Sequence, residues 1–143
     1  MRSCRFAFAV HVLAVLALRP GKLLSSAQLA DTVNTNPVVI RRLLIDLQNA
    51  GLIDTARGPH GGACLAKAPA EVTLWRIHYA VERPTAFALH PNRPSHHCPV
   101  GARIERVMGE VQARLLGSME RELKQITLAD VLSWLEGLPG PAS

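Results

Sequence analysis

The first fifty residues carry apolar positions with the period of an α-helix. A first helix is predicted by apolar residues three and four positions apart, namely Phe6, Val10, Leu13 and Ala17. The Arg-Pro-Gly segment at 19–21 stops this pattern. Ser25 and Gln28 have the spacing of a capping box, which predicts a short helix from about Ser26 to Thr32.

A tight turn and a third helix follow. Asn34 tolerates the left-handed conformation of a turn, Asn36 can cap a helix, and Pro37 suits the first helical position. The third helix is expected from about Pro37 to Asn49. Its apolar face consists of Ile40, Leu43, Leu44 and Leu47, and Gly51 can end it.

Two short strands are predicted at residues 52–56 and 63–66, on either side of the glycine-rich segment 57–62. This order is typical of a β-hairpin. Thr73 can cap a further helix that continues through Glu82. Residues 84–98 contain three prolines and three histidines without a periodic pattern, so they are expected to form a loop.

A long amphipathic helix is expected after Pro99. About 26 residues would span roughly 39 Å, which is longer than a small domain needs for its own core. The helix therefore has an apolar stripe available for a partner. The stripe consists of Val100, Ile104, Val107, Val111, Leu115 and Met119. Thr127 begins a short closing helix, which ends by Gly137.

Helix, short helix, turn, helix and glycine-tipped hairpin, in this order, are typical of a winged helix-turn-helix. The fold class expected is mainly α with a small β-hairpin wing, plus a long dimerisation helix. In such a unit the residues at the start of the second helix face base edges in the major groove. These residues are Thr35, Asn36, Val38, Val39, Arg41 and Arg42. An ordinary surface helix with two arginines is the alternative.

The hairpin tip adds a second candidate contact with DNA. Glycines permit close approach of the backbone, and Arg57 can enter a narrow, electronegative minor groove. The expected wing contacts are Arg57, Gly58, His60 and Gly61. A phosphate-binding P-loop is disfavoured for two reasons. No Gly-Lys-Ser/Thr follows the glycines, and the segment does not join a strand to a helix as a P-loop does.

Charge favours the same partner. The chain has 143 residues and a net charge of +5, and residues 1–83 hold ten basic against five acidic side chains. An anionic partner is therefore expected, with double-stranded DNA first and an anionic membrane second. A basic start before an apolar run is similar to a signal peptide, but His11 interrupts the run. No apolar run has the length of a membrane span. A cytoplasmic location without a membrane partner is expected.

Several segments resemble the winged-helix bacterial regulators of the IscR, NsrR and CymR type, the Rrf2 family. The resemblance rests on residues 50–53, 57–66, 69–74, 80–82 and 126–128. It implies a homodimeric DNA-binding repressor or activator, with the long helix as the dimer seam and Arg57 as the wing contact. His60 stands where the family usually has glycine, and Ala63 where it has an aromatic residue.

The resemblance also bears on the effector. Many members hold an iron–sulfur cluster on three cysteines, of which only Cys98 remains here, so a cluster is disfavoured and no cofactor is expected. Cys98 could instead be a redox sensor, because a helix N-terminus would lower the pKa of its thiol. A metal site made of His90, His96, His97 and Cys98 is a weaker alternative. A solvated loop that binds nothing is favoured over that site.

These observations predict a homodimeric transcriptional regulator, expected to be a repressor, on a palindromic operator. Its parts are a DNA-binding domain (1–83), a linker loop (84–98), a dimerisation and closing helix (99–137) and a disordered tail (138–143). Enzyme motifs are missing, so an enzyme is not expected. Two alternatives stay open. One is a winged-helix module that binds only protein, and the other is a metal-responsive regulator that uses the His/Cys loop.

Overall fold

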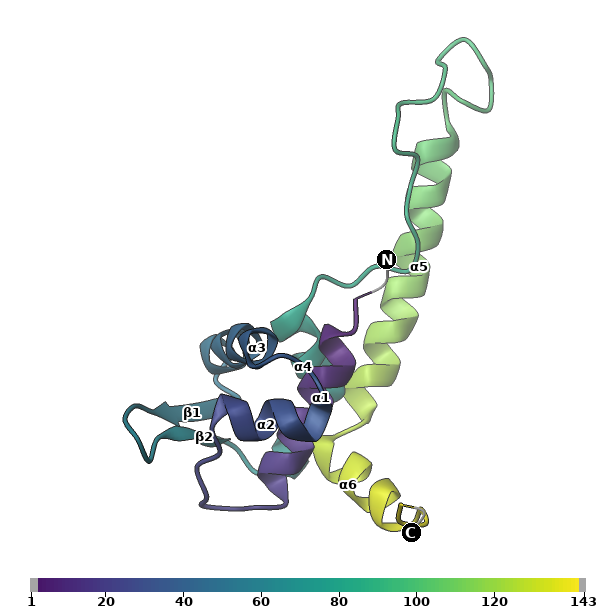
Figure 1. Ribbon diagram of the computed structural model, residues 1–143. Helices are drawn as coiled ribbons and strands as arrows, with labels where there is room; N and C mark the ends of the chain where they lie inside the picture. The colour runs from purple at the N-terminus through teal and green to yellow at the C-terminus, as the bar shows by residue number, and fades with distance from the viewer. Residues whose placement is uncertain (1–2, 142–143) are drawn as a thin grey trace.

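The computed structural model describes residues 3–141, and its elements follow the order that the apolar pattern predicts (Figure 1). The elements are α1 (Arg5–Ala17), α2 (Ser26–Val33), α3 (Pro37–Asn49), β1 (Ile53–Ala56), β2 (Gly62–Leu65), a 3-10 turn (Pro69–Glu71), α4 (Leu74–Val81), α5 (Ile104–Gln125) and α6 (Leu128–Glu136). The predicted class, mainly α with one small antiparallel hairpin, is confirmed.

Helix α1 lies at the centre of the core. Its most buried side chains are Ala9, Val12, Leu13, Ala14 and Leu16. They contact α2, α3, α4, α6 and the hairpin. Because aliphatic side chains of moderate size line the helix on several sides, its neighbours can pack closely around it. The other elements take their positions from this contact.

Local sequence fixes the ends of the short helices. Ser25 accepts a hydrogen bond from the backbone N–H of Gln28, and the Gln28 side chain accepts one from the N–H of Ser25, so the predicted capping box at α2 is present. Asn34 has a φ of 62° in the turn that separates α2 from α3. Thr127 and Asp130 form a second capping box at the start of α6.

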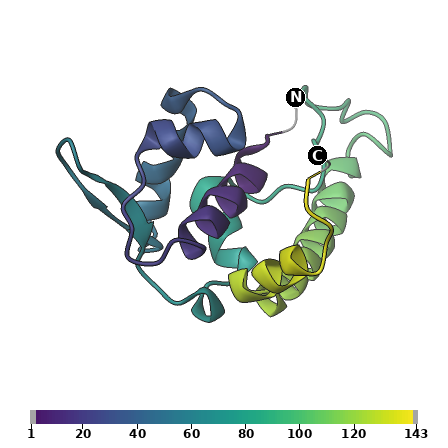
Figure 2. The ribbon, with the colours of Figure 1, turned by 60° about the horizontal axis from the view of Figure 1, so that its bottom comes forward.

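The closing helix returns to the domain where the chain begins. The N–H of Leu74 donates to the carbonyl oxygen of Ile126, and the N–H of Leu128 donates to that of Val72, both at 2.8 Å. Leu128 is fully buried in the same cluster as the side chains of α1. Seen from below, α6 lies beside the turn Pro69–Glu71 (Figure 2). Helix α6 therefore contributes to the core of the N-terminal domain.

Helix α5 and the chain that leads to it extend from the domain as an arm, which we define as residues 84–125 (Figure 1). Residues 84–98 form no helix or strand, as expected for a loop. The predicted start of the long helix is wrong, because α5 begins at Ile104 and has 22 residues. Val100 lies in the turns before it, where Pro99 and Gly101 interrupt regular helix formation.

Two expectations concern the ends and the membrane. Residues 138–141 follow the last helix without further regular structure, and residues 142–143 of the expected tail lie outside the described residues. Among residues 3–141, the structure has no helix that combines the length and the apolar character of a membrane span.

Leu128→Ala tests whether α6 belongs to the core. Truncating this buried side chain should lower the free energy of unfolding by about 2–5 kcal/mol, because it leaves a cavity beside α1. The control is Leu135→Ala in the same helix, where the side chain is half exposed and the change should be about 0.5 kcal/mol or less. Urea unfolding at one protein concentration measures both. Equal effects would contradict this description of the core.

Candidate nucleic-acid interface

Helix α3 presents one face to the core and the other to solvent. Ile40, Leu43 and Leu47 are buried, which fixes the rotation of the helix about its axis. Of the residues predicted to contact bases, four are exposed, namely Asn36, Val38, Arg41 and Arg42. Thr35 and Val39 are only half-buried. The structure therefore gathers the six predicted residues at the outer N-terminal part of α3.

Asn36 also caps the N-terminus of α3. Its side-chain oxygen accepts a hydrogen bond of 2.8 Å from the backbone N–H of Val38, which caps α3. An asparagine that reads adenine uses both its oxygen and its amide nitrogen. Because the cap occupies the oxygen, Asn36 retains its amide N–H groups as donors toward a base or a phosphate.

The hairpin is anchored at its base and open at its tip. Ile53 pairs with Leu65 and Ala56 with Gly62, and Ala63 exchanges two backbone hydrogen bonds with Leu24, of 2.8 and 3.0 Å. Gly62 has a φ of 154°, and a Cβ atom there would lie 2.4 Å from the Leu24 carbonyl oxygen. This close approach requires glycine, and it ties the wing to the segment between α1 and α2.

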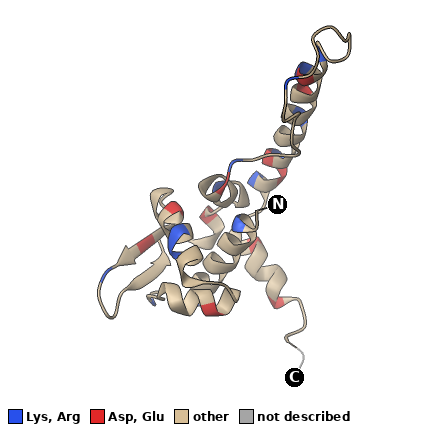
Figure 3. Ribbon diagram, turned by 45° about the horizontal axis from the view of Figure 1, so that its top comes forward, with Lys and Arg blue, Asp and Glu red and all other residues tan. Residues whose placement is uncertain are grey.

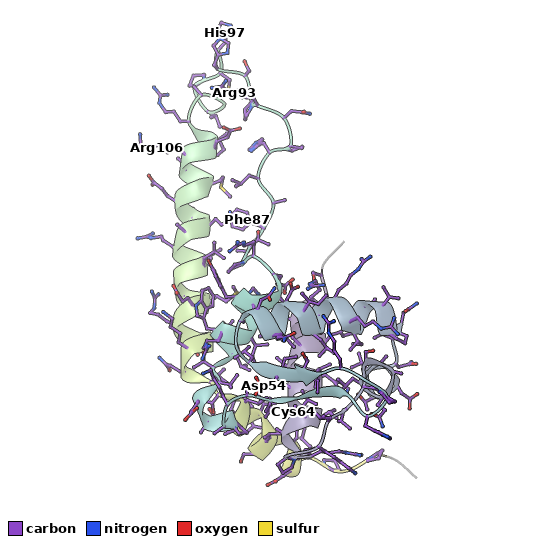
Figure 4. All side chains as sticks on the ribbon, turned by 90° about the vertical axis from the view of Figure 1, so that its left-hand side faces the viewer. Asp54, Cys64, Phe87, Arg93, His97 and Arg106 are labelled. Carbon is purple, nitrogen blue, oxygen red and sulfur yellow. The ribbon has the colours of Figure 1, made fainter. Side chains whose placement is uncertain are left out.

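The predicted wing contacts lie at the open end of the hairpin. Arg57, Gly58 and His60 are exposed, and Gly61 is partly buried against the backbone of Ala56 and Arg57. Viewed from the left-hand side of Figure 1, α3 and the hairpin lie one above the other on the same face of the domain, while the arm rises away from them (Figure 4). Two exposed candidate surfaces therefore share one side of the molecule.

The charges on this side suit a polyanion. Figure 3 shows a basic position near the tip of the hairpin and others on the helices behind it. Among the ion pairs of residues 3–141, none involves Arg41, Arg42 or Arg57. Their guanidinium groups thus remain available to phosphate or to a base edge.

The apolar stripe of α5 is uncovered in the single chain. Val107, Val111 and Leu115 are 50%, 40% and 48% exposed, and none of the helix residues is buried. Ile104 and Met119 are half-buried, and Val100 is exposed in the preceding turns. Five of the six predicted seam residues therefore lie on one helix, and Val100 does not.

The arm carries the predicted effector residues at its far end. His97 lies at the tip, and Cys64 is far below it in the hairpin (Figure 4). The rings of His96 and His97 are 4.1 Å apart. Within residues 3–141, no group of three or more His, Cys, Asp or Glu side chains lies close enough to hold a metal ion. The four residues of the metal alternative are thus not brought together as a site.

Cys98 has the lowered thiol pKa that was expected, but not for the expected reason. Helix α5 begins six residues later, so Cys98 is not at its N-terminus. Backbone N–H groups of Gly101 and Val100 hydrogen-bond to the sulfur and lower the pKa, while slight desolvation opposes them. Gly101 permits this turn, because a Cβ atom there would lie 2.2 Å from the Ser95 carbonyl oxygen.

Sequence reasoning missed the ion pair that joins α1 to α3. Arg5 pairs with Asp46, and its Nε–H donates to the Val81 carbonyl oxygen at 2.8 Å. The partners lie 41 and 76 residues away along the chain. No local spacing could reveal such a contact. One side chain therefore links the recognition helix to the end of α4.

The molecule has a helix-turn-helix with an anchored wing, and a basic face that consists of Arg41 and Arg42 on the recognition helix α3 and Arg57 on the wing. These features define a winged-helix DNA-binding regulator. The comparisons specify the class. Residues 2–133 match the model of the Rrf2 family, described as iron-dependent transcriptional regulators. The chain belongs to this family, which confirms the resemblance drawn from the sequence and the expectation that the protein is not an enzyme.

Known relatives extend over nearly the whole chain. YwnA of Bacillus subtilis, a regulator of the helix-turn-helix type, is 38% identical over 136 residues, which cover 94% of this chain and 99% of YwnA. NsrR of Halalkalibacterium halodurans is 32% identical, covering 88% of this chain and 86% of NsrR. The structure of T. potens IscR matches with a TM-score of 0.70 and 23% identity over 99% of this chain and 93% of IscR, a likeness of fold.

The regulators of this family are described as iron-dependent, and the cysteines of this chain are its candidate donors for an iron–sulfur cluster. An iron–sulfur cluster is held mainly by several thiolates close together. Here Cys98 lies in the arm, Cys64 in β2 and Cys4 before α1, and all three are free. These residues do not fit an iron–sulfur cluster.

The thiol of Cys98 should react at a lower pH in the folded protein than in the unfolded chain. The side chain is exposed, and in the folded protein it receives backbone hydrogen bonds that favour a thiolate. Alkylation of Cys98 by iodoacetamide should therefore reach half its maximal rate at a lower pH in buffer than in concentrated urea. Mass spectrometry of peptides from two pH series measures both rates. Identical profiles in the two states would contradict the proposed effect of the turn.

Proposed function

We propose that the protein is a homodimer which represses transcription by binding a palindromic operator with two copies of the basic face. The observation that carries this proposal is the common orientation of α3 and the hairpin, with Arg41, Arg42 and Arg57 free of ion pairs on exposed positions. A cytoplasmic location follows from a chromosomal partner. Three exposed arginines on one face, without an ion pair among residues 3–141, favour a polyanion over the protein-only alternative.

The roles of the individual residues follow from their positions. Val38 can contact a thymine methyl group, whereas Arg41 and Arg42 can bind guanine or phosphate. Thr35 and Val39, half-buried, complete the contact surface, and Asn36 donates its amide N–H groups. Arg57 enters the minor groove, flanked by Gly58, His60 and Gly61. Phosphate contacts fix the register, and the base contacts supply the specificity.

A second copy of the chain is the occupant proposed for the stripe of α5. A helix of 22 residues is about 33 Å long, and its apolar side chains are half exposed in the single chain. An isologous interface between two such helices would bury the stripe and place two recognition helices on one DNA face. Half-sites about 34–36 Å apart would then suit the dimer.

Regulation through Cys98 is a second proposal, favoured by the exposed thiol with a lowered pKa at the tip of the arm. Peroxide would oxidise the thiolate to a sulfenic acid, with peroxide reduced to water or an alcohol. The oxidised sulfur would lose its hydrogen bonds to the backbone of the turn before α5. Because this turn leads into the helix of the proposed dimer, its rearrangement would change the dimer interface.

Arg57→Ala should weaken operator binding by about 1–3 kcal/mol, and Arg41→Ala or Arg42→Ala should do the same. A mutant that loses a guanine contact should also become less selective at one base pair. A mutant that loses a phosphate contact should instead reduce the steepness of log K plotted against log salt concentration by about one. The control is Arg106→Ala, which removes an equal charge from the arm. Fluorescence anisotropy at several salt concentrations measures binding. Unchanged affinity in all three mutants would remove this face from the mechanism.

Val111→Glu should convert the dimer to a monomer, because it places a carboxylate in the apolar seam. The mutant should also lose cooperative binding to an operator with two half-sites. Ala113→Glu adds the same charge to an exposed position on the opposite side of the helix and should remain dimeric. Light scattering measures the mass of each protein. A wild-type monomer at micromolar concentration would overturn the proposed dimer.

A further inference from the structure

A pocket of about 920 Å³ lies where the arm leaves the DNA-binding domain. Its walls include Ser3 before α1, His78 in α4, and the residues that follow α4, among them Glu82, Arg83, Thr85 and Phe87. Phe87 lies on the ascending part of the arm, close above the domain (Figure 4). This volume is within the range of small-molecule sites. The pocket shares no residue with the proposed DNA contacts or the stripe of α5.

His78 is the least expected residue in this wall. It is 8% exposed, and it is the buried polar residue of the core among residues 3–141. Its ring meets the ring of Phe6 edge-on at 4.7 Å, and its Nε2 is 3.6 Å from a carboxylate oxygen of Glu82. The Nδ1 atom is buried and has no hydrogen-bond partner. Because Nδ1 is closed off from solvent, the contact of Nε2 with Glu82 is the polar interaction by which His78 acts in this wall, where it holds the Glu82 carboxylate in place.

The charges of the pocket restrict the kind of ligand. Glu82 offers a carboxylate whose side chain is 21% exposed, and Arg83 follows it with a guanidinium that is also 5.3 Å from the centre of the Tyr79 ring. A simple anion would be repelled by Glu82, and a simple cation by Arg83. A molecule with both an ammonium and a carboxylate group can pair with both residues. Ala86, Ala88 and Phe87 supply a small apolar surface beside them.

The pocket is connected to both functional surfaces. The backbone N–H of Arg5 donates to the hydroxyl of Ser3 at 3.2 Å, and the guanidinium of Arg5 pairs with Asp46 of α3. On the other side, the N–H of Phe87 donates to the side-chain oxygen of Gln112 in α5 at 3.4 Å. A ligand that contacts Ser3 and Phe87 together would thus affect the position of α3 relative to α5. Such a ligand changes DNA affinity if it binds one arrangement better than another.

We propose that this pocket binds a small zwitterion of the amino-acid class, and that its occupancy alters the affinity of the regulator for DNA. The ammonium group pairs with Glu82, which His78 holds in place, and the carboxylate pairs with Arg83. The regulatory half of this proposal rests on the DNA-binding function proposed above. The binding half does not.

The test uses the full chain and each standard amino acid as probe. Thermal unfolding identifies amino acids that raise the midpoint temperature, and calorimetry without DNA then gives their affinities. At least one should bind the wild type. Glu82→Gln and Arg83→Met should each weaken its binding by about tenfold or more, because each leaves one charge of the ligand unpaired. Arg106→Met, outside the pocket, should bind as the wild type does.

The two halves fail separately. The proposed binding site would be overturned if no amino acid binds, or if Glu82→Gln and Arg83→Met bind the amino acid as tightly as the wild type does. This holds whatever the protein does with DNA. Binding that leaves operator affinity unchanged would overturn the regulatory half alone. Both halves would be supported if the amino acid changes the operator affinity of the wild type and of Arg106→Met but not that of Glu82→Gln or Arg83→Met.

Discussion

Burial of α1 is the interaction on which the rest of this structure depends. Its side chains contact the helix-turn-helix, the hairpin, α4 and α6, so one apolar helix sets the relative positions of all surfaces discussed above. Apolar burial has no direction of its own, and the geometry comes from close packing of Leu, Val and Ala side chains. The Arg5–Asp46 pair and the Leu24–Ala63 bridge then fix α3 and the wing on this base.

The arm is the part of the structure that this core covers least. Helix α4 contacts α5, but the core is concentrated around α1 and none of the α5 residues is buried. Charged residues alternate along its exposed sides, visible as successive blue and red segments in Figure 3. They keep these sides of the helix in contact with water, and they make the arm a poor candidate for the DNA contact itself.

The sequence predicted those parts whose signals are local. The bounds of α2 and α3 are predicted to within one residue by their caps, which are Ser25 with Gln28 and Asn36 before Pro37. The glycine-rich segment predicts the hairpin. The start of α5 was placed four residues too early, because apolar spacing continues through turns that Pro99 and Gly101 keep irregular. The Arg5–Asp46 pair and the pocket around His78 bring together residues that are far apart in the chain. The spacing of apolar residues cannot predict such contacts.

Selection of binding sites from random DNA, followed by hydroxyl-radical footprinting, would show whether two copies of the basic face read one operator. We expect an enriched inverted repeat, with two protected segments centred about 34–36 Å apart and added minor-groove protection at the wing positions. Enrichment of a single unpaired site, or of no sequence at all, would contradict the proposed dimer on DNA.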